Sequence, residues 1–537
     1  MNGGTLIEVA GDIVLRFTQS VTERYNPDEP EFTLESFGYD PLPRTGREWN
    51  YHSFDEPIYQ EYSDREVSSA NYLSNNSPNV RVGDACSPDN EDQHENEAET
   101  MAWKRLRPSA LHTGFKSMYI GALISLLTAC IIGTIYLLLS YLSYKTKSNC
   151  EQIDIIPVRV EWLTTIADVI SCVFYYIWPL FNLFLLFRPY QLKGVKRKLI
   201  LVTFIMYCLD PLYRGVLQAL RKPFFELSAL YSSLSNVPVY MFVFTNVCLL
   251  FYFAAKHVIV LPRLKLVFQI CKMAMPTCLT ILSAFAIRYL VYPPYNEQHT
   301  DGKLLIALFS PLMGVIFKAV SRICVQRLWN ITHPGYSYVL LAPLYFLLAI
   351  MFRVLQADLD SLESIAILGV IHGFAEVVER STVVIIDHIC HQICRRESSP
   401  WGSFRTPRRE RLMADIAIMS MLYESTAIVS VNGLLHLYQW IYLENESFLK
   451  LFLSFAKYTS VPLVIEWFFT SVSLAIETRY QNMAVMAVWR RQWKRHILVA
   501  IVNILPVAIW TSGNLLVVIR HRFDNVPANQ TCKIPFS

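Results

Sequence analysis

Charged side chains are scarce in this sequence. Asp, Glu, Lys and Arg make up 17% of the 537 residues, whereas an ordinary soluble protein carries about 25%. Hydrophobic residues make up 53% of the chain. Glycine is also scarce, at 19 residues, and no stripe of small residues marks a helix dimer interface. The composition therefore favours an integral membrane protein over a soluble domain.

Common catalytic motifs are missing. The sequence has no phosphate-binding loop G-x-x-x-x-G-K-[ST], no nucleophile elbow G-x-S-x-G and no zinc pair H-E-x-x-H. We therefore expect no cofactor, and an enzyme is the less favoured class. An enzyme embedded in the membrane stays open as an alternative, with His372 or His436 as a base and Glu376 or Glu424 assisting.

Charge is distributed unevenly along the chain. Residues 1–100 contain 21 acidic residues against 6 Lys and Arg, a net charge of −15. Because the whole chain has a net charge of +4, residues 101–537 must carry +19. The first 115 residues are polar and lack apolar periodicity, which predicts a mostly disordered, acidic cytosolic tail. Residues 116–520 are predicted to form the membrane domain and residues 521–537 a short exoplasmic tail. No nucleic-acid partner is expected.

Long apolar segments predict an all-α bundle of about eleven transmembrane helices. A helix needs about 20 mainly apolar residues to cross the hydrocarbon, and none of these segments alternates as the strands of a membrane barrel do. The segments lie near residues 118–142, 163–187, 199–220, 235–255, 267–290, 303–324, 337–355, 364–386, 414–441, 459–478 and 497–519.

Lys and Arg in the connections predict the orientation. With the N-terminus in the cytosol, the inner connections carry 25 basic residues and the outer ones 11, in accord with the positive-inside rule. An odd number of spans then places the C-terminus outside. The inner segments 395–411 and 489–496 mix Trp with Arg and are expected to contact an anionic lipid leaflet.

The outer segments contain candidate sites for glycosylation and for a disulfide, two modifications that occur on the exoplasmic side of a membrane. Asn445 and Asn529 begin glycosylation sequons, and Asn529 lies in the more accessible segment. Cys150 and Cys532 are the two cysteines expected outside the membrane on this face, where a disulfide between them is a candidate.

The segment "IHGFAEVVERSTVVIIDHICH", residues 371–391, has charges in an apolar helix. At 100° per residue, all its ionisable side chains except His388 fall on an arc of about 120°. Because a bare charge at the bilayer centre costs at least about 2.5 kcal/mol, this arc is expected to face the bundle interior or a wet path. The residues on the arc are His372, Glu376, Glu379, Arg380, Asp387 and His391.

Other predicted spans contain possible partners for this arc. Asp415, Glu477 and Lys318 are expected nearer the membrane interface, where long side chains reach water. The deeper candidates are harder to hydrate, and a carboxylate without a cation there could exchange protons. These deeper groups are Asp168, Asp210, Lys272, Glu424 and Glu466.

Three interpretations of the charged arc remain. The favoured one is an ion or proton path in a transporter or channel of the plasma or endosomal membrane. The second is a set of salt bridges that only fix helix packing, as in a receptor or scaffold. A metal site formed by "DHICHQIC", residues 387–394, is the least favoured because one helix cannot complete its ligand shell. We therefore expect no metal.

Overall fold

The computed structural model describes residues 110–146, 158–187, 189–219, 237–258, 262–326, 328, 332, 334–359, 361–395, 407–442, 447–479, 483 and 485–520. These residues are almost entirely helical, and none of them forms a strand. Nine helices within these ranges are long and apolar enough to cross a membrane. The protein is therefore an all-α, multi-pass integral membrane protein.

The helices occupy the apolar segments in chain order. They are α4 (Ala110–Ala122), continued through a π-helical turn at Leu123–Thr128 into α5 (Ala129–Thr146), then α6 (Val158–Leu186), α7 (Lys196–Ala219), α9 (Val237–Val258), α10 (Arg263–Ala286), α11 (Tyr292–Glu297), α12 (Thr300–Gln326), α13 (Ala342–Ala357), α14 (Leu362–Arg395), α15 (Pro407–Tyr442), α16 (Phe448–Arg479) and α17 (Val485–Arg520).

Two of the eleven predicted spans differ from the other nine. Helix α13 has 16 residues, a length of about 24 Å, which is shorter than the hydrocarbon thickness of about 30 Å. Helix α14 is 34 residues long, but its middle contains Glu376, Glu379 and Arg380, so it is not apolar enough to be identified as a span by hydropathy. Nine spans meet both criteria of length and hydropathy.

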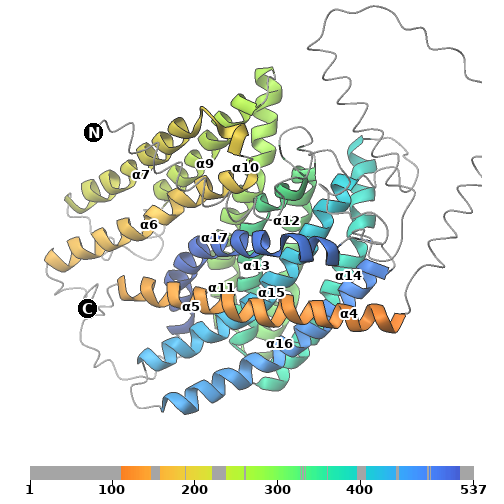
Figure 1. The fold of residues 1–537 in the computed structure, drawn as a ribbon. Coiled ribbons are helices and arrows are strands. Elements are labelled where there is room, and N and C mark those ends of the chain that lie inside the picture. Colours follow the sequence, from red (N-terminus) through yellow and green to blue (C-terminus); the bar gives the residue numbers. More distant parts are fainter. Residues whose placement is uncertain are drawn as a thin grey trace, which may run out of the picture.

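The helices pack in two groups joined by α13 and α17 (Figure 1). One group contains α6, α7, α9 and α10, drawn in yellow to light green. The other contains α4, α5, α14, α15 and α16. Helices α13 and α15 form the core. Residues Ala342–Gln356 of α13 are all buried, and so is 94% of the most apolar stretch of α15.

Prolines interrupt the backbone hydrogen bonding of many of these helices. Proline has no N–H to donate, and its ring kinks the helix, which opens space between neighbours. Pro343 lies in the first turn of α13, where the missing donor costs nothing. Six prolines lie inside described helices: Pro179, Pro211, Pro276, Pro311, Pro462 and Pro506.

The basic segment 489–496 is part of a helix instead of a loop. Helix α17 begins at Val485 and is broken at Gln492, whose backbone angles are not helical (φ −122°, ψ 17°). Trp489, Arg495 and His496 are buried. The guanidinium of Arg495 lies 3.3 Å from the ring centre of Tyr336. Three of the eight residues of this segment therefore pack inside the protein, which limits its predicted contact with lipid.

Candidate functional site

Helix α14 separates charged from apolar side chains. Ile367, Ile371, Phe374 and Val378 are 41–63% exposed and form an apolar stripe at helical spacing. The side chains of Glu376, Glu379 and Arg380 are 13%, 17% and 7% exposed. The charged face therefore turns toward α12, α15 and α16 and leaves the apolar face for lipid.

Arg380 is the cation at the centre of this face. Its Nε and Nη2 donate to Oε1 and Oε2 of Glu477 on α16 at 2.8 and 2.7 Å, a two-bond pair. Its Nη1 lies 3.6 Å from Oε1 of Glu376, which also accepts a hydrogen bond from Ser420 Oγ at 3.3 Å. Glu477 is thus held tightly and Glu376 loosely.

Arg353 on α13 forms a second centre of the network. Its Nη2 lies 2.6 Å from Oε2 of Glu466 on α16 and 3.5 Å from Oε2 of Glu424 on α15. Its Nη1 donates to Gln356 Oε1 at 2.8 Å, and Gln356 donates to the carbonyl of Ile365 on α14 at 2.8 Å. Arg353 therefore ties α13 to three neighbouring helices.

Lys318 on α12 supplies a third cation. Its Nζ lies 3.5 Å from Oε2 of Glu379 and 5.2 Å from the ring centre of Tyr345. The lysine is 7% exposed, so burial leaves Glu379 and the ring face as its stabilising neighbours. This pair joins α12 to α14.

Five glutamates and three cations form these three ion-pair groups, which we together call the glutamate network: Lys318, Arg353, Glu376, Glu379, Arg380, Glu424, Glu466 and Glu477. Arg322, one helical turn beyond Lys318, is a fourth buried cation. The carboxylates still outnumber the cations. Because unpaired charge is costly in a membrane interior, this acidic excess favours binding of a proton or a cation.

The glutamates of the network fall into two groups. Glu466 and Glu477 are 2% and 3% exposed and lie within 2.7 Å of an arginine nitrogen. Glu376, Glu379 and Glu424 are 13–17% exposed and lie 3.5–3.6 Å from their cations. The tight pairs suit a structural role, whereas the loosely paired glutamates are better placed to exchange a proton or ion.

The other residues of the predicted arc are only partly described. His372 is half-buried, and its Nε2 lies 3.3 Å from the carbonyl oxygen of Ala307 on α12. The side chains of Asp387, His388 and His391 lie outside the described part of the structure, as do those of Cys390 and Cys394. The interpretation of residues 387–394 as a metal site therefore stays a hypothesis.

Asp168 and Asp210 lie in a separate cluster between α6 and α7. Arg214 donates from Nε to Oδ1 of Asp210 at 2.9 Å, and its Nη1 lies 3.6 Å from Oδ2 of Asp168. Its Nη2 also donates to Sγ of Cys172 at 3.3 Å. The structure does not join these aspartates to the glutamate network through any contact that it describes.

The expectation that Asp415, Glu477 and Lys318 reach water is wrong for all three, because each is buried in the protein. Glu477 and Lys318 are buried in the glutamate network. Asp415 is fully buried, with Oδ2 3.0 Å from Arg411 Nε and Oδ1 3.1 Å from His496 Nε2. Position along a span estimates depth, but it does not reveal a buried cation on a neighbouring helix.

Sequence reasoning missed Arg353. It is the only charged residue of the apolar segment 337–355, which was a usable signal because such a residue requires a buried counter-ion. Its two carboxylate partners are 71 and 113 positions away in sequence, and only the fold identifies them.

Several other predicted sites cannot be located. Cys150, Cys532, Asn445 and Asn529 all lie outside the described residues. Among the described residues, no three His, Cys, Asp or Glu side chains are grouped so that they could hold a metal ion. Comparison with known proteins found no matching family model, no similar curated protein and no similar solved structure.

Proposed function

We propose that this protein is a transporter or channel that moves protons or small cations through the glutamate network. The observation that supports this most directly is the excess of carboxylates over cations within the glutamate network, five against four when Arg322 is counted. A network that only fixed packing would be more stable with balanced charges, because each uncompensated carboxylate adds a desolvation cost.

The loosely paired glutamates supply the proposed path. Glu376 and Glu379 lie on α14, and Glu424 lies on α15. Each is close enough to a cation to be stabilised when ionised, yet none has the two-bond pairing of Glu477. Exchange of a proton or cation at these three groups would leave the tight pairs intact, so the bundle could keep its packing during transport.

A receptor or scaffold whose charges are structural is the second candidate. The two-bond pair of Arg380 with Glu477 and the 2.6 Å pair of Arg353 with Glu466 favour it, because both tie helices together. The two candidates make different predictions for Glu376. In a transporter or channel its side chain contributes little to helix packing, whereas in a receptor or scaffold it helps to hold the helices together.

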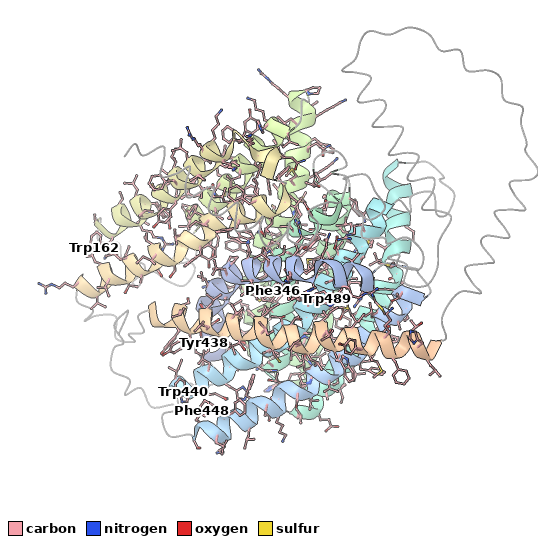
Figure 2. All side chains as sticks on the ribbon, viewed as in Figure 1. Trp162, Phe346, Tyr438, Trp440, Phe448 and Trp489 are labelled. Carbon is pink, nitrogen blue, oxygen red and sulfur yellow. The ribbon has the colours of Figure 1, made fainter. Side chains whose placement is uncertain are left out.

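The proposed orientation has eleven spans, with the N-terminus in the cytosol and the C-terminus outside. The distribution of Lys and Arg supports this orientation. Trp162, Trp440 and Phe448 are exposed at helix ends that it places on the outer side, where they would mark the membrane boundary (Figure 2). Aromatic side chains are enriched where a helix leaves the hydrocarbon. We further propose contact of segments 395–411 and 489–496 with anionic lipid, and residence in the plasma or endosomal membrane.

The function can be tested with purified protein in liposomes that contain a pH-sensitive dye. An imposed potassium diffusion potential should drive proton entry only into liposomes with protein. Glu376→Gln keeps the size of the side chain and should lower the rate by about tenfold or more, since a barrier increase of about 1.4 kcal/mol has that effect.

The control is Glu363→Gln, which changes an exposed glutamate in the first turn of the same helix. It should leave the rate unchanged. Both variants are first compared with the unmodified protein by gel filtration and thermal unfolding. Absence of flux with intact folding, or equal flux in Glu376→Gln and the unmodified protein, would reject the transport proposal. Loss of folding in Glu376→Gln alone would favour the scaffold.

A further inference from the structure

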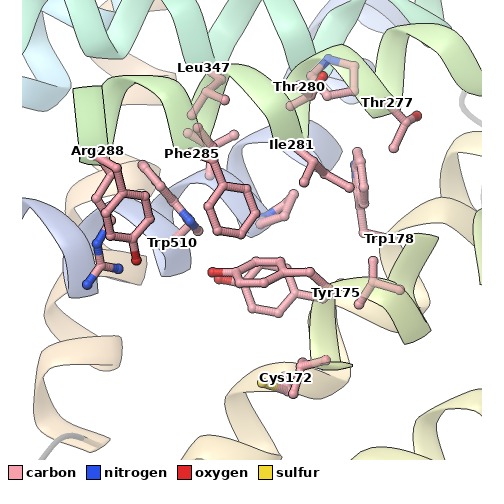
Figure 3. A pocket seen from close by; sticks show the side chains of 18 of the residues that line it. Cys172, Tyr175, Trp178, Thr277, Thr280, Ile281, Phe285, Arg288, Leu347 and Trp510 are labelled. Atoms are coloured by element: carbon pink, nitrogen blue, oxygen red, sulfur yellow. The ribbon is translucent and has the colours of Figure 1, made fainter. Parts of the chain in front are cut away.

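A cavity lies between the group of α6, α7, α9 and α10 and the two joining helices α13 and α17. Its volume is about 150 Å³, and side chains from all six of these helices line it (Figure 3). Pro343 and Pro506 are in the wall, where helix irregularity leaves room. Six of the residues in the wall are aromatic: Tyr175, Trp178, Tyr240, Phe285, Tyr289 and Trp510.

The wall is mainly apolar, and two of its polar groups are already bonded to the protein. Trp178 Nε1 donates to Asn503 Oδ1 at 2.9 Å, and Thr280 Oγ1 donates to the carbonyl of Pro276 at 2.8 Å. A buried water needs two to four polar partners, and dry apolar cavities of this kind stay empty or take an apolar guest. Occupation of this cavity by water is therefore disfavoured.

Size and charge narrow the choice of ligand. An engineered apolar cavity of about 150 Å³ in another protein accepts benzene, so a single ring is a suitable size here. Aromatic walls also favour rings in edge-to-face contact. Arg214 and Arg288 lie in the wall, and two guanidinium groups disfavour an organic cation. Arg214 is already paired with Asp210 and Asp168, which removes it as a partner for an anion.

We propose that this cavity is a binding site for a small, uncharged apolar group, of a size between benzene and indole, or for a short length of alkyl chain. The site is separate from the proposed ion path. Helix α13 contributes to both, with Pro343 and Leu347 in the cavity wall and Arg353 in the glutamate network.

Indole is a suitable probe, and thermal unfolding of the purified protein at fixed detergent concentration is the measurement. A ligand that binds only the folded state raises the melting temperature in a saturable way. Ala284→Phe places a ring in the cavity and should raise the half-saturating indole concentration by about tenfold or more, the effect of losing about 1.4 kcal/mol of binding.

The matched control is Leu282→Phe, two residues away on α10, where the side chain is 51% exposed. It adds a ring outside the cavity and should bind indole as the unmodified protein does. Partition of indole into micelles affects both variants equally. If Ala284→Phe does not fold, Phe285→Ala replaces it: it enlarges the cavity and should shift the preference from indole toward naphthalene.

The proposal is overturned if indole gives no saturable shift, if Ala284→Phe and Leu282→Phe respond alike, or if Phe285→Ala leaves the preference unchanged. Repeating the titration in lipid nanodiscs identifies the source of the apolar group. A shift that persists there indicates a free small molecule, whereas a shift seen only in detergent indicates that a lipid chain fills the cavity in the membrane.

Discussion

Arg380 on α14 and Glu477 on α16 face each other with two parallel hydrogen bonds of 2.8 and 2.7 Å. The side chains are 7% and 3% exposed, so neither can turn to water if the other is removed. This pair, together with Arg353 and Glu466, connects the helices that carry the loosely paired glutamates. Its integrity should therefore be a condition for folding.

Glu477→Gln should destabilise the protein strongly. Removing one partner of a buried ion pair costs about 3–5 kcal/mol, and here Arg380 would lose its two short bonds and keep Glu376, at 3.6 Å, as its counter-charge. Thermal unfolding in detergent measures the effect. As a control, Asp358→Asn breaks the 2.9 Å contact with Lys303, whose side chain is 26% exposed, and should cost less than about 1 kcal/mol. Equal effects of the two substitutions would contradict a structural role for Glu477.

Gly373→Ala should separate α14 from α16. A Cβ at Gly373 would lie 2.4 Å from Cδ2 and 2.7 Å from Cγ of Phe469, and the base of a ring cannot move aside as a flexible chain end can. Overpacking of this kind costs about 1–3 kcal/mol. The control is Gly215→Ala in α7, where no atom lies within 4 Å of the added carbon.

That control should be neutral, or should stabilise its helix by up to about 1 kcal/mol through the higher helix propensity of alanine. Denaturation of both variants and of the unmodified protein under one set of conditions gives the comparison. An unchanged melting temperature for Gly373→Ala would mean that α14 and α16 do not pack as closely as described.

The fold class could be predicted from composition and hydropathy, because lipid requires long apolar helices. The inward-facing glutamates of α14 could also be predicted, since helical periodicity places Glu376 and Arg380 on one face. Not all of the cations that pair with the glutamates could be predicted. The pair of Glu376 and Arg380 lies on one helix and follows from sequence spacing, whereas Arg353 and Glu466 meet only through the packing of α13 against α16. Likewise, the cavity depends on side chains from six helices, which no local pattern reveals.

The orientation predicts a glycan on Asn529. Expression in cells should give a protein whose apparent mass falls on treatment with a glycosidase, and Asn529→Gln should remove most of this change. A tag at the C-terminus should be stained on intact cells that display the protein, whereas a tag at the N-terminus should need permeabilised cells. Staining of both ends under the same condition would show that the number of spans is even.

The central claim is that the loosely paired glutamates border a wet path while the opposite face of α14 contacts lipid. Reaction of introduced cysteines with a charged, water-soluble thiol reagent tests it most directly, in a variant that lacks the 12 native cysteines. Glu376→Cys and Ser420→Cys should react, and Phe374→Cys, although 63% exposed, should not. Reaction at position 374 with none at 376 or 420 would contradict the account.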